Sequence, residues 1–191
     1  MLSETLKEET KDLHVALEKA MVPMIRNIRV NEDYIQVLQL FYSYFGGLEK
    51  KLATVAALNV PDYAHRRKKE AIAKDIISLG GTVPELTPNL HLPAIENELQ
   101  AWGALYVMEG STLGGLHISK MIAKHLDLQN GTSLAFFDGY GDHTNSMWES
   151  FKSAMDQKIT SPEEQAIVVQ SANDTFTAFK SWIELKTASY R

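Results

Sequence analysis

Apolar residues recur at helical spacing along almost the whole chain, and this limits the fold more than any other feature of the sequence. In the first segment Leu2, Leu6, Leu13 and Leu17 lie at multiples of a helical turn, which places them on one helix face. No stretch of useful length alternates between apolar and polar residues as a half-buried strand would. We therefore predict an all-α protein of six or seven helices, in a single domain over residues 1–191.

Local signals indicate where several helices begin and end. The stretch "SPEE" at 161–164 combines an N-cap serine, a proline at the first helical position and a glutamate at the third, and predicts a helix from there to about residue 187. Gly80 and Gly81 predict the end of another helix. The stretch "LAFFDGYGDH" at 134–143 predicts an irregular or short helical link. The remaining helices are expected at about residues 2–21, 31–58, 62–79, 94–128 and 146–157.

Composition excludes several classes of function. The chain has no cysteine, which excludes disulfides, thiolate metal ligands, iron–sulfur clusters and a cysteine nucleophile. A net charge of −5 and a pI of about 5.7 argue against nucleic-acid or anionic-membrane partners, and "HRRKK" at 65–69 is interpreted as a solvated helix face. No apolar run reaches the ~18 residues of a membrane span, and the charged N-terminal segment is unlike a signal peptide. We expect a soluble, cytoplasmic protein.

One row of the first expected helix carries chemistry-bearing side chains. Lys7, Lys11, His14 and Glu18 are spaced four, three and four residues apart, so they share a face of a continuous helix. An imidazole beside two ammonium groups suits a metal-bound ligand with anionic arms. The row also fits a surface helix whose lysines pair with neighbouring glutamates, and this helix taken alone favours that plainer interpretation.

The stretch "EGSTLGG" at 109–115 places three glycines inside a segment that is otherwise strongly helical. Gly110, Gly114 and Gly115 each cost a helix about 1 kcal/mol relative to alanine. Such a bare strip of backbone can accept a flat ligand, or it can let a neighbouring helix approach closely, which is the commoner use of glycines four residues apart. The second glycine directly after Gly114 exceeds what a helix crossing needs, and it permits a kink.

Three stretches together resemble the haem oxygenase family. "LSETLKEETKDLHVALEKAM" is similar to the proximal helix of that family, "EGSTLGG" to its glycine-rich distal helix, and "LDLQNGTSLAFF" at 126–137 to the segment that follows. They occur in the family's order and at compatible separations, so the resemblance covers most of the chain. It implies a multi-helical fold that holds haem between a proximal helix and a kinked distal helix.

The resemblance implies roles for the residues on the proximal side. His14 matches the axial ligand of the haem iron. Lys7 and Lys11 match basic residues that meet the haem propionates. Lys152 falls where the family has another propionate-binding basic residue, although the loop before it is shorter in this sequence.

On the distal side, Gly110, Gly114 and Gly115 match the glycines that face the haem, with the bend at the last two. Ser111 stands where the family often has an aspartate that holds a water network beside bound oxygen. A hydroxyl group can still donate and accept hydrogen bonds, but it carries no charge. We expect Gly110 and Ser111 to serve the catalytic step.

The resemblance implies a haem oxygenase that cleaves haem at a meso carbon to biliverdin, carbon monoxide and ferrous iron. Haem is then substrate and cofactor, dioxygen is the oxidant, and the electrons come from a partner protein, a ferredoxin or a flavoprotein reductase. A biliverdin-accepting protein is a further candidate partner.

Two alternatives remain open. One is a non-catalytic haem-binding carrier or sensor of the same fold, for which Ser111 in place of an aspartate is the main support. The other is an all-α enzyme that acts on another small molecule, such as a thiamin-related pyrimidine. The absence of a cysteine nucleophile and the presence of the His14 row count against the second alternative.

Overall fold

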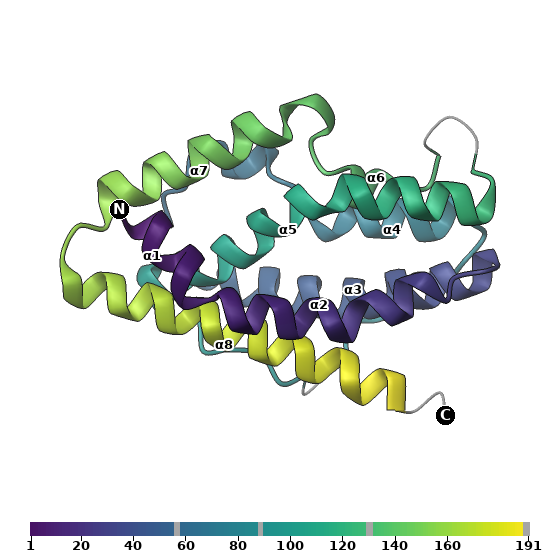
Figure 1. Ribbon diagram of the computed structural model, residues 1–191, viewed down its shortest axis with the longest axis horizontal. Coiled ribbons are helices and arrows are strands. Elements are labelled where there is room, and N and C mark those ends of the chain that lie inside the picture. The colour runs from purple at the N-terminus through teal and green to yellow at the C-terminus, as the bar shows by residue number, and fades with distance from the viewer. Residues whose placement is uncertain (56–57, 88–89, 129–131, 189–191) are drawn as a thin grey trace.

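The computed structural model describes residues 1–55, 58–87, 90–128 and 132–188, and all regular structure in these residues is helical. The prediction of an all-α protein is thus confirmed (Figure 1). The α-helices are α1 (Leu2–Glu9), α2 (Lys11–Arg26), α3 (Asn31–Leu52), α4 (Lys69–Ser78), α5 (Glu98–Leu126), α6 (Ala135–Asp138), α7 (Thr144–Lys158) and α8 (Pro162–Ala188). In the part of the chain that the structure describes, the 3-10 helices η1 (Tyr63–His65) and η3 (Gly141–His143) lie in the connections. No helix in the described ranges is long and apolar enough to cross a membrane.

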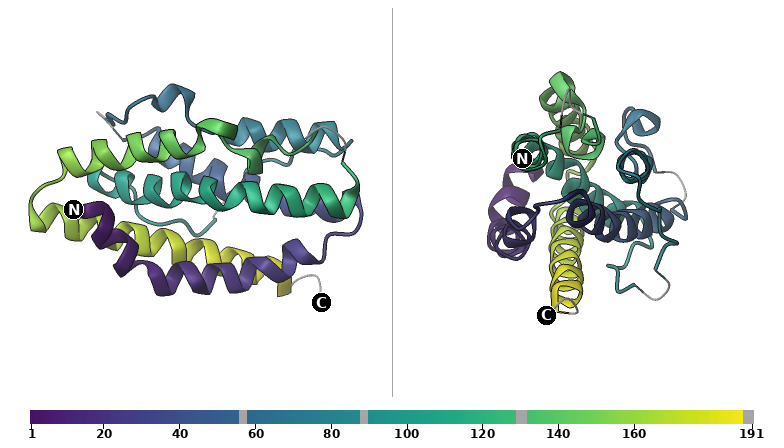
Figure 2. Two further views of the ribbon diagram at one scale, coloured as in Figure 1. Left: turned by 45° about the horizontal axis from the view of Figure 1, so that its top comes forward. Right: turned by 90° about the vertical axis from the view of Figure 1, so that its right-hand side faces the viewer.

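Among the described residues, the long helices α5 and α8 make the most extensive contact between two helices. Helix α2 lies along α8, while α3 packs on α4, and α6 packs on both α4 and α5 (Figures 1 and 2). Direct contact between α2 and α5 is slight. The two helices are therefore held near each other mainly through their shared neighbours.

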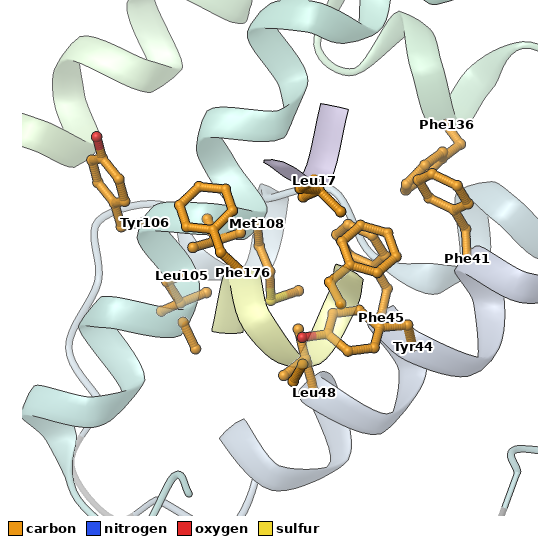
Figure 3. Close-up of a cluster of buried hydrophobic side chains, with 14 of the residues drawn as sticks. Leu17, Phe41, Tyr44, Phe45, Leu48, Leu105, Tyr106, Met108, Phe136 and Phe176 are labelled. Atoms are coloured by element: carbon orange, nitrogen blue, oxygen red, sulfur yellow. The ribbon is translucent and has the colours of Figure 1, made fainter. Parts of the chain in front are cut away.

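Aromatic side chains fill the core where α3, α5, α6 and α8 meet. Figure 3 shows Phe41, Tyr44 and Phe45 of α3 in this cluster, together with Phe136 of α6. The rings of Tyr44 and Phe179 stack with their centroids 4.3 Å apart. Such contacts add to the free energy gained from burying apolar surface, and they fix α3 and α6 against the C-terminal helix.

The first expected helix is two helices in the structure. The chain bends at Thr10, which lies between α1 and α2 with φ −103° and ψ −3°. The Thr10 hydroxyl donates to the carbonyl of Leu6 at 2.7 Å, a back-bond that commonly bends helices. Lys7 therefore lies on α1, whereas Lys11 and His14 lie on α2. The prediction that these residues share one straight row is wrong.

Candidate functional site

His14 is the central residue on the α2 side of the candidate site. Its side chain is 55% exposed, and its Nε2 lies 3.7 Å from Oε1 of Glu18. The edge of its ring packs on Phe176 of α8, with the ring centroids 5.6 Å apart. The aromatic contact holds the ring from one side, while half of the imidazole stays open to a ligand.

Lys7 and Lys11 do not pair with the glutamates around them. Both lysines are exposed. Glu4 binds the N-terminal ammonium group, and Glu18 lies beside His14. Within the described ranges neither lysine has a carboxylate partner at ion-pair distance. The lysine–glutamate pairs of the plainer interpretation are therefore not seen among the described residues.

The three glycines of the "EGSTLGG" stretch of α5 have three different environments. A Cβ added at Gly114 would meet no atom within 4 Å, so this position is open next to the backbone. At Gly115 an added Cβ would lie 2.2 Å from the carbonyl oxygen of Phe137, so α6 packs directly on this glycine. At Gly110 the nearest atom, 3.6 Å from an added Cβ, belongs to Trp148 of α7.

Gly114 and Gly115 thus have separate roles, because neighbouring residues of a helix point about 100° apart. Gly114 leaves bare backbone exposed, whereas Gly115 permits the close approach of α6. The second role differs from the haem-facing position that the resemblance implies for Gly115. Helix α5 remains one continuous helix of 29 residues, and Figure 1 shows that it changes direction partway along its length.

Arg67 supplies a charge beside Ser111 that the sequence analysis missed. Its Nη2 donates to the Ser111 hydroxyl at 2.6 Å, and the hydroxyl in turn donates to the Met108 carbonyl at 2.7 Å. Nη1 of Arg67 donates to the carbonyl of Phe136 at 3.1 Å, and the guanidinium group lies 4.2 Å from the centre of that phenyl ring. Burial lowers the pKa of Arg67 to about 10, against the opposing effect of Glu109. The group thus stays protonated at neutral pH.

The neighbouring Arg66 is buried and forms an ion pair with Glu109 of α5. The hydroxyl of Tyr140 donates to the same carboxylate at 2.9 Å and accepts the backbone N–H of Arg67 at 2.9 Å. Burial and the charge of Glu109 raise the pKa of Tyr140 to about 12, so the phenol stays protonated. This polar network fixes the segment that carries Arg67 onto α5.

The interpretation of "HRRKK" as a solvated helix face is therefore wrong at its two arginines. Arg66 has extended backbone, with φ −74° and ψ 149°, which directs its side chain into the interior and delays the start of α4 to Lys69. One signal in the sequence could have indicated this. Glu109 stands at the end of the apolar run "LYVM", and a carboxylate buried in such a segment requires a cation or several hydrogen bonds.

Lys152, the third expected basic residue, already has a partner. Its ammonium group binds Glu149 at 2.9 Å on the same helix, α7. It also lies 5.7 Å from the ring centre of Trp148, the residue that packs beside Gly110. Lys152 is thus near α5, and it is not a free cation.

Comparison with known proteins identifies the family. The sequence model of the family described as "Heme oxygenase" matches residues 1–185. The chain belongs to the haem oxygenase family. It is therefore an enzyme of this family, and the resemblance inferred from three short stretches is confirmed. A curated relative from Xanthomonas campestris, "Heme oxygenase", is 30% identical over 151 residues, which cover 78% of this chain and 87% of the relative.

Solved structures of the family share the fold. The heme oxygenase of Neisseria meningitidis, solved with NO and CO bound, superimposes with a TM-score of 0.82 at 22% identity, over 98% of this chain and 92% of that one. Heme oxygenase-1 of Synechocystis, in complex with heme, gives a TM-score of 0.73 at 15% identity, over 98% and 93%. At these identities the likeness establishes the fold, and the roles of individual residues rest on the geometry above.

Proposed function

We propose that this chain binds haem between α2 and α5 and cleaves it at a meso carbon to biliverdin, carbon monoxide and ferrous iron. Dioxygen is the oxidant, and a ferredoxin or flavoprotein reductase supplies the electrons. Membership of the family and the haem complex of the Synechocystis relative support this proposal. The observation that carries it is the presence of both a half-exposed His14 on α2 and an open Gly114 on α5.

The side chains of α1 and α2 suit the proximal side of such a site. Among the described residues, no three His, Asp or Glu side chains gather to hold a metal ion. A single imidazole is nevertheless enough to hold a haem iron, because the porphyrin ring supplies the other ligands of the metal. Lys7 and Lys11, which have no carboxylate partner among the described residues, are available for two propionates. Lys152 would have to exchange Glu149 for a propionate.

The face of α5 suits the distal side. Gly114 leaves room for a flat ring against the helix backbone. Leu113, next to Gly114 on α5, and Val15, next to His14 on α2, are large apolar side chains exposed to solvent, and a porphyrin ring would cover such surface. The residues present therefore fit haem, which when bound supplies the metal centre that activates dioxygen.

Ser111 and Arg67 would together replace the aspartate that many family members have. The Ser111 hydroxyl can hold a water molecule beside the distal face of the haem. Arg67 fixes that hydroxyl at 2.6 Å and keeps a positive charge close to where negative charge develops, which is a preorganised electrostatic contribution to catalysis. The carrier or sensor alternative depends on the lack of charge at position 111. The adjacent guanidinium group weakens that argument.

The function is tested by adding haem to the purified protein, then a reductant, and recording absorption spectra over time. We expect a Soret band to form, then to decay as a biliverdin band grows, with carbon monoxide released in equal amount. A stable Soret band under reducing conditions, with no verdin product, would identify a haem carrier or sensor. Failure to form a Soret band would reject haem binding altogether.

A further inference from the structure

Helix α6 depends on a carboxylate from another helix. It has four residues, Ala135–Asp138, and the N-cap residue Leu134 offers no side-chain hydrogen bond. Isolated helices shorter than ~12–15 residues are marginal in water. Asp75 of α4, which is 1% exposed, provides the missing cap. Its Oδ1 accepts the N–H of Ala135 at 3.0 Å, and its Oδ2 accepts the N–H of Phe136 at 2.8 Å.

Helix α6 in turn contacts the distal side of the proposed haem site at several points. The Phe136 carbonyl accepts a hydrogen bond from Arg67, and the Phe136 ring lies against the same guanidinium group. The Phe137 carbonyl occupies the space beside Gly115. The carboxylate of Asp138 accepts the hydroxyl of Ser119 on α5. A shift of α6 would therefore move Arg67 relative to Ser111.

We propose that Asp75 is a positioning residue for the distal side of the haem site. By capping α6 it fixes the carbonyl and the ring that hold Arg67 beside Ser111, and it fixes the contact between α6 and Gly115. This inference rests on the proposed function, because the residues it positions are those assigned to haem cleavage. Asp75 itself lies on α4 and touches neither Ser111 nor Gly114 in the structure.

The substitution Asp75→Asn removes the charge and one acceptor while it keeps the size of the side chain. Burial raises the pKa of Asp75, while the hydrogen bonds from Phe136 and Ala135 lower it. Because asparagine has nearly the same shape and keeps one acceptor for the two N–H groups, we expect the variant to fold. Asp156→Asn is the matched control. Asp156 of α7 accepts hydrogen bonds from the N–H and the hydroxyl of Ser3 at 2.8 and 2.6 Å. It thus also caps the start of another helix, α1, and it lies far from Arg67 in the sequence.

The first measurement is hydrogen exchange on the protein without haem, which does not depend on the function. In Asp75→Asn we expect several-fold faster exchange in peptides that cover 132–140 and 108–118. Asp156→Asn should accelerate exchange only near α1. Asp75→Glu keeps the carboxylate but displaces it, so its exchange rates should lie between those of the wild type and Asp75→Asn. If Asp75→Asn does not fold, Asp75→Glu takes its place in the experiment. Unchanged exchange in α6 would overturn the proposal.

The second measurement combines Asp75→Asn with Arg67→Lys in single-turnover haem cleavage. Misplacing a catalytic group by about 1 Å can cost up to ~100-fold, and we expect Asp75→Asn to slow cleavage about tenfold. In the Arg67→Lys background the same change should add little, because its effect passes through Arg67. If Asp75→Asn slows haem cleavage by the same factor in the wild-type and Arg67→Lys backgrounds, Asp75 is a general stabilising residue and does not act through Arg67. If the wild-type protein cleaves no haem, the proposed function fails while the exchange result stands.

Discussion

At the scale of single residues, the site is defined by what surrounds Ser111 more than by Ser111 itself. A serine in place of an aspartate removes a negative charge from the distal helix. The structure places the positive charge of Arg67 at 2.6 Å from its hydroxyl. The hydrogen-bond donors of the guanidinium group are divided among Ser111, Met108 and Phe136, so both its position and its orientation are fixed.

This arrangement predicts that Arg67→Lys damages catalysis although it keeps the charge. An ammonium group cannot reproduce the planar set of donors that Arg67 directs at three acceptors. We expect single-turnover cleavage to fall by about 10–100-fold, equivalent to ~1.4–2.7 kcal/mol, with a smaller effect on haem affinity. The control is Lys68→Ala, because the ammonium group of Lys68 lies 3.4 Å from the ring centre of Tyr63, away from Ser111. Equal loss in both variants would contradict a specific role for Arg67.

A second prediction at this scale concerns the iron ligand. His14→Ala should abolish the wild-type Soret spectrum and haem cleavage, and added imidazole should partly restore both, because the space that it would occupy already opens to solvent. His117→Ala is the control, since His117 is an exposed residue of α5. The assignment is wrong if His14→Ala keeps the wild-type spectrum while His117→Ala loses it.

At the scale of elements, sequence patterns predicted the helices whose ends are set locally. The hydroxyl of Ser161 caps α8 by accepting the N–H of Glu164 at 3.2 Å, as "SPEE" indicates. The bend at Thr10 and the late start of α4 were missed. The bend depends on which acceptor the Thr10 hydroxyl bonds to. The late start of α4 depends on the contact of Arg66 with Glu109, which lies 43 positions later in the chain. Spacing along one helix carries no information about either.

The distal helix gives a prediction in which adjacent glycines behave in opposite ways. Gly114→Leu should leave the apo protein as stable as the wild type or more stable by a few tenths to ~1 kcal/mol. The helix gains propensity, and the added Cβ would meet no atom within 4 Å. Haem binding or cleavage should be lost. Gly115→Ala should destabilise the apo protein by about 1–3 kcal/mol, because its Cβ would collide with the backbone carbonyl of Phe137.

Thermal or denaturant unfolding of both apo variants, with haem affinity and turnover measured beside it, separates the two roles. The proposal that haem lies against the bare backbone at Gly114 is contradicted if Gly114→Leu is strongly destabilised while its folded fraction still binds and degrades haem normally. The role of Gly115 in the close approach of α6 is contradicted if Gly115→Ala unfolds at the same midpoint as the wild type.

At the scale of the whole molecule, the sequence indicated the two faces of the site but not how they are connected. Helices α2 and α5 both pack on α8 and make little direct contact. The Arg67 side of the site is held separately, through α6 and the Arg66–Glu109 pair. Which helices act as supports depends on contacts between residues far apart in the chain, such as Tyr44 with Thr175, and no local pattern encodes these. Haem bound between α2 and α5 would thus add a direct bridge to the indirect one that α8 provides.

This view predicts where haem binding changes local stability. At short labelling times hydrogen exchange reports local openings, so adding haem should slow exchange mainly in residues 11–26 of α2 and in the second half of α5. Exchange in residues 69–78 of α4, which contain no proposed haem contact, should change little. Haem in large excess over its Kd also raises the free energy of unfolding, by about 4 kcal/mol at 1,000 times Kd, so the melting temperature should rise as well. In His14→Ala the protection of α2 should be lost before that of α5. Protection confined to helices other than α2 and α5 would place the haem site elsewhere.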